Sequence, residues 1–295
     1  MSIKTRKGWF FILLLFFLNS CSEKYDLLEI TIPTEASADS ITLHFEIADT
    51  VSAKSYSPLG AGRYVNVYAY RSPAALYGTP IAVSKYRTTS SGLLSPVGNA
   101  MKLVEGRYDF YVVATNSLTD DLPVITGTYS NPLSDKTDYL WDRISGINVT
   151  RKMGSIPFYL LRCCTKISID IQESIFTFIW GVRWVKIIAP GGIQRLNLLD
   201  GTINPSVYPG TSLIDMNLTN TVSSAILLPY AGRSPLKVYF SVWTNLNYDY
   251  KTYEVGLLPS GGSFRAGVSY RYKAIIEDDV LSFVEIAQDS IRYIK

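Results

Sequence analysis

The sequence predicts an all-β protein, with two tandem β-sandwich domains behind an export signal. Apolar and polar residues alternate with a period of two in many short segments, which is the pattern of half-buried strands. Turn residues separate these segments about every ten residues, and no long segment has the 3.6-residue period of an amphipathic helix. Aromatic residues make up 13% of the chain, including 21 tyrosines, and this composition favours strands.

The first twenty residues have the form of a signal peptide. Three basic residues precede an unbroken apolar run, Trp9–Leu18. This run is too short to cross a bilayer as a helix, which needs about 20 residues, and a basic start before a short apolar run is typical of secretory signals. We therefore expect residues 1–20 to be a signal that is cut between Ser20 and Cys21.

The end of this signal, Leu18-Asn19-Ser20-Cys21, resembles a bacterial lipobox. In a lipobox the cysteine becomes the acylated N-terminus, and each buried CH₂ of the lipid contributes about 0.8 kcal/mol of membrane affinity. We expect lipidation at Cys21, with residues 21–40 as the lipidated tether. An ordinary signal peptide with a chance cysteine is the alternative.

The charge of the chain excludes one class of partner. The sequence holds 28 basic and 25 acidic residues, and the predicted signal contains three of the basic ones and no acid. The rest of the chain is therefore balanced, so it has no basic field to bind a polyanion. Nucleic acid is not an expected partner.

The first sandwich is expected over residues 41–174, and its first strand is the most regular. Ile41, Leu43, Phe45 and Ile47 share one face of this strand, and polar residues occupy the other. A long loop follows over residues 49–62. Later strands of this domain are expected at residues 64–70, 81–87, 107–114 and 158–171.

The second sandwich is expected over residues 175–295, with the boundary inside residues 172–179. Its strands are predicted by the same alternation and by glycine, proline and asparagine turns between them. They lie at residues 182–188, 225–228, 238–243, 250–257, 270–276 and 281–286.

The sequence contains no recognisable catalytic, metal or cofactor site, and we expect neither an enzyme nor a cofactor. The only histidine, His44, is predicted on the exposed face of the first strand. No cysteine and histidine set has zinc-ligand spacing, and no glycine-rich phosphate loop occurs. A two-carboxylate glycosidase stays formally open, because acids distant in sequence can meet in space. Cys163 and Cys164 are expected to be packing residues, with a vicinal disulfide as the alternative.

Surface aromatic residues leave a second function open. Trp243, Tyr248 and Tyr250 could stack on sugar rings, which would make the protein a lipid-anchored glycan-binding module. The simpler expectation is that these rings pack inside the sandwich. Binding on a glycan array separates the two readings, and turnover of a polysaccharide would identify a surface hydrolase.

The order of several motifs resembles the fimbrillin family of the Bacteroidales, the type V pilins with their anchor and tip relatives. The motifs are the lipobox, Val-Asn-Val-Tyr-Ala-Tyr at 65–70, Gly-Arg-Tyr-Asp-Phe-Tyr at 106–111, Asp-Tyr-Leu-Trp at 138–141, Lys-Ile-Ser-Ile at 166–169, Leu-Leu-Pro at 227–229 and Phe-Arg-Ala-Gly at 264–267. The resemblance implies two transthyretin-like sandwiches and a lipoprotein of fimbriae on the outer membrane. It also implies other fimbrial subunits as partners and leaves a host or bacterial surface receptor open.

The resemblance further implies assembly by strand exchange. In stalk subunits of the family a protease cuts the loop after the first strand, and a strand of another subunit fills the groove that is left. The residues that would be exchanged here are Ile41, Leu43, Phe45 and Ile47, and Leu281–Ile294 is the candidate donor. The alternative is that both segments are ordinary strands of one monomer. The loop offers Lys54 and Arg63 for cleavage. The arginine usual in the family is replaced by Lys54, and Arg63 adjoins the next strand, so an anchor or accessory subunit is the alternative to a stalk subunit.

Overall fold

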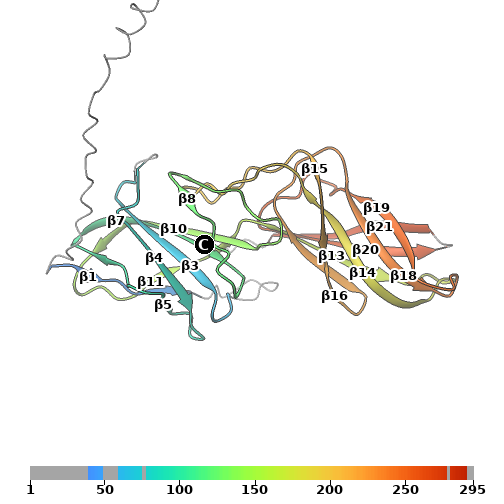
Figure 1. Ribbon diagram of the computed structural model, residues 1–295, viewed down its shortest axis with the longest axis horizontal. Coiled ribbons are helices and arrows are strands. Elements are labelled where there is room, and N and C mark those ends of the chain that lie inside the picture. Colours follow the sequence, from blue (N-terminus) through green and yellow to red (C-terminus); the bar gives the residue numbers. More distant parts are fainter. Residues whose placement is uncertain (1–38, 49–58, 75–77, 278–279, 291–295) are drawn as a thin grey trace, which may run out of the picture. The chain divides into compact units, whose positions relative to one another are not determined.

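The computed structural model describes residues 39–48, 59–74, 78–277 and 280–290. These residues form strands and turns and contain no α-helix (Figure 1). None of their segments is a helix long and apolar enough to cross a membrane. The all-β fold class predicted from the two-residue alternation is confirmed.

The first sandwich is built on a six-stranded sheet. Its central strand, β7 (Gly106–Thr115), pairs antiparallel with β3 (Tyr64–Arg71) and β10 (Tyr139–Val149). The complete order is β12 (Leu161–Arg162), β10, β7, β3, β4 (Ala82–Thr88) and β5 (Leu94–Pro96). Both faces of β7 are apolar, as its sequence indicates, because Phe110 and Val112 lie in one hydrophobic cluster and Tyr111 and Val113 in another.

The facing layer of this sandwich consists of short paired segments. β1 (Ile41–Thr42) runs antiparallel to β6 (Lys102–Leu103), and β2 (Phe45–Ile47) runs parallel to β11 (Ile156–Phe158). A separate small hairpin joins β8 (Ile125–Thr126) to β9 (Tyr129–Ser130). The first hydrophobic core lies between the six-stranded sheet and the first strand.

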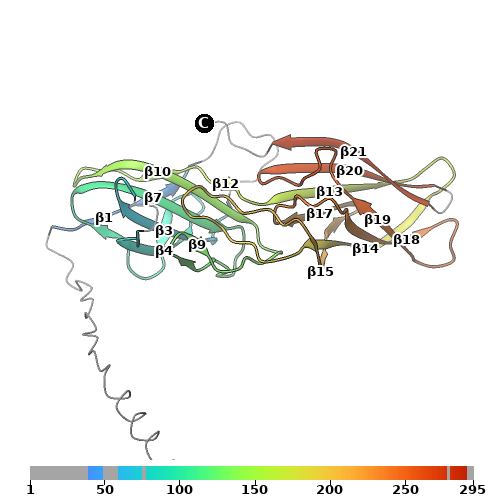
Figure 2. The same cartoon turned by 90° about the horizontal axis from the view of Figure 1, so that it is seen from above.

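The second sandwich has two larger sheets. One has the order β16 (Asn217–Thr219), β17 (Val222–Leu227), β13 (Thr165–Gln172), β20 (Val268–Glu277) and β21 (Val280–Ser290). The other has the order β15 (Pro209–Asp215), β14 (Ile179–Pro190), β18 (Leu236–Thr244) and β19 (Lys251–Leu257). Figure 2 shows β13, β20 and β21 in one layer and β14 and β18 in the other. Ile167 and Ile169 of the first layer and Phe240 of the second lie in one hydrophobic cluster.

The sheets divide earlier in the chain than the expected boundary after residue 174. β13 was expected in the first domain, but it pairs with β17 and runs parallel to β20. Its alternating isoleucines therefore fill the second core. The division falls between β12 and β13, at Cys163 and Cys164, which are buried and not bonded to each other. Residues 172–179 mostly connect β13 to β14 within the second sandwich.

The connection between β14 and β15 covers the outer face of the six-stranded sheet. The indole Nε1 of Trp141 donates a hydrogen bond of 2.7 Å to the carbonyl oxygen of Leu198. Gly201 lies against the same ring with a φ of +71°, and a Cβ there would be 2.4 Å from Trp141, so glycine is required for this close approach. A backbone pair between Ser130 and Leu196 adds to the contact. This apolar packing joins the two sandwiches.

Candidate assembly site

The first strand lies between two other segments of the chain. Its odd-numbered backbone groups face one edge, where Leu43 N–H donates to Met101 O at 2.9 Å and Ile47 N–H donates to Gly92 O at 2.8 Å. Its even-numbered groups face the other edge, where Ile156 N–H donates to His44 O and Ala48 N–H donates to Phe158 O, both at 2.9 Å. Removing this strand would therefore leave unpaired backbone groups on both sides of a gap.

The side chains of the strand fill the first core as its alternation predicts. Leu43 is 3% exposed and Phe45 is 1% exposed, while Ile41 and Ile47 pack at the border of the same cluster. The Phe45 ring meets Tyr86 at 5.4 Å and Phe110 at 5.7 Å edge to face, and stacks on Phe158 at 5.7 Å. The strand is held by general apolar complementarity and backbone pairing, which another strand of similar pattern could supply.

Gly92 is a part of this site that the sequence pattern alone did not identify. It has a φ of +83°, and a Cβ at this position would lie 2.7 Å from the carbonyl oxygen of Ile47. A larger residue would therefore both strain the turn and push the end of the first strand away. The segments that flank the groove, at Met101 and at β11, also escaped prediction, because β6 and β11 are too short to show an alternation.

Of the two candidate cleavage residues, only Arg63 lies within the described ranges. Lys54 lies outside the described residues. Arg63 is half-buried, and its backbone pairs with Thr88: Arg63 N–H donates to Thr88 Oγ1 at 2.9 Å and Thr88 N–H donates to Arg63 O at 3.0 Å. Thr88 Oγ1 also donates to Gly60 O at 2.6 Å. A protease needs an extended and accessible backbone, so this pairing disfavours cleavage at Arg63 in the folded chain.

The candidate donor strand is β21, at the edge of its sheet. Among the described strands it pairs with β20 alone. Phe283 points inward, with its ring 5.6 Å from Phe240 and 6.0 Å from Tyr272. Val280, Val284 and Ile286 form an outward row that is 66%, 51% and 57% exposed. An exposed apolar row on an edge strand is suited to pairing with another chain.

The other positions predicted from the sequence are the cleavage and lipidation residues, the end of the donor segment, the histidine and the two adjacent cysteines. Ser20 and Cys21 lie outside the described residues, as does the end of the donor segment beyond Ser290. His44 is exposed, as expected. Cys163 and Cys164 are 3% and 0% exposed, and burial raises the pKa of each thiol far above its ordinary value. Their expected role in packing is confirmed.

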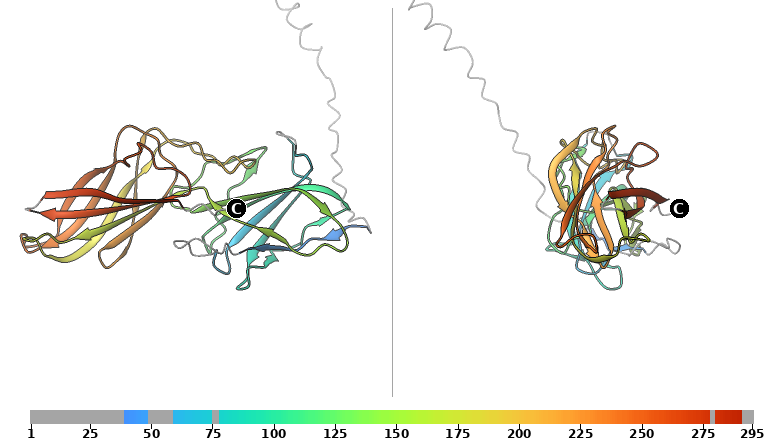
Figure 3. Two further views of the ribbon diagram at one scale, coloured as in Figure 1. Left: turned by 180° about the vertical axis from the view of Figure 1, so that it is seen from behind. Right: turned by 90° about the vertical axis from the view of Figure 1, so that its right-hand side faces the viewer.

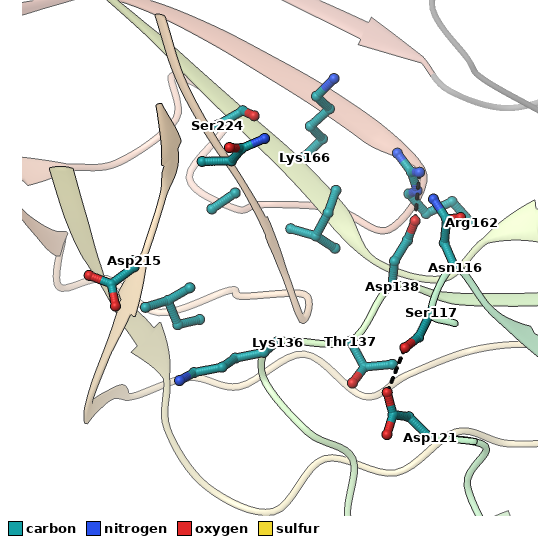
Figure 4. A pocket seen from close by; sticks show the side chains of 14 residues that line it. Asn116, Ser117, Asp121, Lys136, Thr137, Asp138, Arg162, Lys166, Asp215 and Ser224 are labelled. Carbon is teal, nitrogen blue, oxygen red and sulfur yellow. Dashed lines mark hydrogen bonds and ion pairs between the residues drawn. The ribbon is translucent and has the colours of Figure 1, made fainter. Parts of the chain in front are cut away.

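A cavity of about 600 Å³ has several charged residues in its lining: Asp121, Lys136, Asp138, Arg162, Lys166 and Asp215. Figure 4 shows two of its acids held by neighbours from the same sandwich: Asp138 accepts a 2.6 Å hydrogen bond from Arg162, and Asp121 accepts a 2.7 Å one from Ser117. Burial raises the pKa of Asp138, opposed by the Arg162 charge. Hydrogen bonds from Thr119 and Ser117 lower the pKa of Asp121. Asp138 and Asp121 thus serve as hydrogen-bond acceptors for their neighbours.

No group of three or more potential metal ligands occurs within the described ranges. The aromatic residues named from the sequence behave differently from expectation, since Tyr248 is fully exposed and Tyr250 is 38% exposed. Neither ring packs inside the sandwich, because Tyr248 lies in a bend of the connection between β18 and β19 and Tyr250 directly precedes β19.

The sequence matches no known protein-family profile and no curated protein. The fold does match solved structures from Bacteroides. A proposed cell adhesion protein from Bacteroides uniformis ATCC 8492 has a TM-score of 0.64 at 14% identity, with 86% of this chain and 100% of that chain covered. One from Bacteroides ovatus ATCC 8483 has a TM-score of 0.59 at 14% identity, covering 85% and 96%.

A fimbrial protein from Bacteroides vulgatus ATCC 8482 has a similar fold as well. Its TM-score is 0.56 at 14% identity, with 85% of this chain and 99% of that chain covered. The resemblance to Bacteroidales fimbrial and adhesion proteins, first indicated by the order of sequence motifs, therefore holds at the level of the fold.

Proposed function

We propose that this chain is a non-enzymatic subunit of a surface fimbria that assembles by exchange of its first strand. The observation that carries the proposal is the position of Ile41–Ile47, which is hydrogen-bonded along both edges and inserts Phe45 into the core. A strand in this position can be replaced by one from another subunit with little change to the rest of the sandwich. The shared fold with fimbrial and adhesion structures supports the proposal.

The donor in this proposal is β21 of a neighbouring subunit. Its alternation of Leu281 and Phe283 with outward residues resembles the pattern of the first strand. A site for a specific protease engineered into residues 49–58 should release the first strand and permit polymers. Deletion of residues 281–295 should then stop polymerisation. Cleaved protein that stays monomeric with its first strand bound would contradict the proposal, as would a deletion variant that polymerises equally well.

We also propose that the subunit is tethered to the outer membrane by lipid on Cys21. The lipobox spacing carries this part. The Cys21→Ala variant should accumulate as a precursor or leave the membrane fraction, while Ser22→Ala should be processed normally. Fractionation and the mass of the protein test it. A Cys21→Ala protein of normal mature mass in the outer membrane would contradict lipidation.

A further inference from the structure

One sheet of the second sandwich carries aromatic residues on its outward face. Val238, Phe240 and Val242 of β18 point inward and are fully buried, so Tyr239 and Trp243 point outward. Ser241 alternates with the inward residues of β18 and also points outward. Trp184 lies opposite Ser241 in the antiparallel pair, so its side chain points outward as well. We call Trp180, Trp184, Tyr239, Trp243 and Tyr250 the aromatic face. It contains three of the five tryptophans of the chain.

Three rings of the aromatic face, those of Trp180, Trp243 and Tyr250, contact one another. Trp180 and Trp243 meet edge to face with centroids 5.1 Å apart, and Trp243 and Tyr250 are 5.9 Å apart. Gly181 gives room for this arrangement, because a Cβ there would lie 2.9 Å from the Tyr250 hydroxyl. Trp180 nevertheless stays 59% exposed. The face therefore presents ordered rings to solvent.

The loops beside the face are tied together by Asn245. Its Oδ1 accepts from Phe178 N–H at 2.7 Å, its Nδ2 donates to Phe176 O at 3.1 Å, and its own N–H donates to Phe178 O at 3.0 Å. Figure 3 shows the loops after β13 and β18 at the same end of the second sandwich. Trp243 Nε1 also donates to Asn247 O at 3.1 Å. A ligand would meet a preorganised surface, which lowers the entropy cost of binding.

Charged groups lie on the same side of the sheet, beside Trp184 and Tyr239. Lys186 pairs with Asp215 at 3.2 Å, and Lys237 pairs with Glu254 at 2.7 Å. The Arg183 guanidinium lies 5.9 Å from the centre of the Tyr250 ring. A protein partner that covered the whole aromatic face would have to bury these ion pairs, which is costly, and the mixed charges do not form the basic face that favours a lipid surface. Sugar hydroxyls can hydrogen-bond to such groups while the apolar side of a pyranose stacks on a ring.

We propose that the aromatic face binds a glycan of β-linked glucose or galactose, with Trp180 and Tyr250 as stacking residues. The axial C–H bonds of these sugars give one side of each ring an apolar surface. This binding site goes beyond the proposed assembly role and does not depend on strand exchange. It would be present in the monomer.

The test uses the chain from Ser22 onward, uncleaved and monomeric. A glycan array that includes β-glucosides and β-galactosides identifies the bound oligosaccharide, and calorimetry measures its affinity. Trp180→Ala and Tyr250→Ala should each weaken binding about tenfold, the loss expected for one stacked ring. The matched control is Ile175→Ser, since Ile175 is 82% exposed in the neighbouring loop but is not part of the aromatic face; its affinity should be unchanged. Urea unfolding checks that each variant is folded.

Three outcomes would overturn the proposal. The first is a folded protein that binds no glycan on the array, and the second is binding that Trp180→Ala and Tyr250→Ala leave unchanged. The third is loss of binding in Ile175→Ser, together with binding of phosphatidylcholine vesicles or self-association through the same loop. In that case the loop, and not the aromatic face, would be the docking surface.

Discussion

At the scale of single residues, Phe45 has the largest part in holding the first strand. Its ring contacts three other aromatic rings, from β4, β7 and β11. The two-residue alternation predicted that Phe45 would be buried. It could not predict the partners, because Tyr86, Phe110 and Phe158 come from segments far apart in sequence and only the fold brings them together.

Truncation of this ring should therefore be costly. Phe45→Ala should lower the free energy of unfolding by about 3–5 kcal/mol, the usual cost of removing a buried phenylalanine. His44→Ala, on the exposed side of the same strand, should change it by less than about 0.5 kcal/mol. Urea denaturation of both variants measures the difference. Equal effects would mean that the first strand is not packed as described.

A second residue, Asp109 of β7, ties the backbone at Ala74 and at Gly146 of β10 to the central strand of the six-stranded sheet. It is 2% exposed, and its carboxylate accepts hydrogen bonds from Ala74 N–H at 2.9 Å and from Gly146 N–H at 2.7 Å, beside the bulge in β10. Burial by itself would raise its pKa, but these two N–H groups, Ser72 and Arg143 together lower it.

The lowered pKa of Asp109 predicts a specific pH dependence. Because the folded pKa lies below the unfolded value of about 3.9, the stabilisation is complete above that value and is lost as the pH falls through the folded pKa. Asp109→Asn should cost about 1–3 kcal/mol at neutral pH. The difference in unfolding free energy between the two proteins should shrink below about pH 4. A constant difference from pH 7 to pH 3 would contradict this role.

At the scale of elements, local alternation predicted most strands but not how they pair. The isoleucines of β13 identified a half-buried strand correctly. Its assignment to the first domain did not hold, because β13 pairs in parallel with β20, about a hundred residues later in the chain. Such pairing leaves no mark on the local pattern. The outward orientation of the aromatic face was also not predicted, because a tryptophan in an alternating strand fits either side of a sheet.

The pairing of Arg63 with Thr88 gives a prediction for the loop before β3. Brief trypsin treatment of the folded protein should spare Arg63. Thr88→Ala removes the hydroxyl that bonds to Arg63 N–H and to Gly60 O, so it should speed the cut after Arg63. Thr89→Ala, whose hydroxyl is exposed and contacts only Ser91 Oγ among the described bonds, is the control. Mass spectrometry of the fragments identifies the cuts, and initial cleavage at Arg63 in the unchanged protein would contradict the prediction.

At the scale of the whole molecule, one principle accounts for both the stability and the proposed assembly. The first strand completes a core that the rest of the first sandwich cannot close alone. The second sandwich has its own core, and its edge strand β21 exposes an apolar row. In the proposed assembly, the edge strand of one subunit replaces the first strand of the next, and the chains join head to tail.

The most direct test of assembly by strand exchange uses an engineered disulfide that reversibly fixes the first strand in its groove. Thr42 and Lys102 lie directly opposite each other in an antiparallel pair, where Cα atoms are about 4.5–5.5 Å apart, within the range of about 4.4–6.8 Å found in disulfides. The variant Thr42→Cys with Lys102→Cys should therefore form a disulfide, in a chain that begins at Ser22 and carries the engineered protease site. Thr42→Cys alone is the control.

Light scattering after protease cleavage measures whether each variant forms polymers. The account predicts that the oxidised double variant stays monomeric, that reductant restores polymers, and that the single variant polymerises in both conditions. Polymers of the oxidised, cleaved double variant would show that the first strand need not leave its groove, and would contradict assembly by strand exchange.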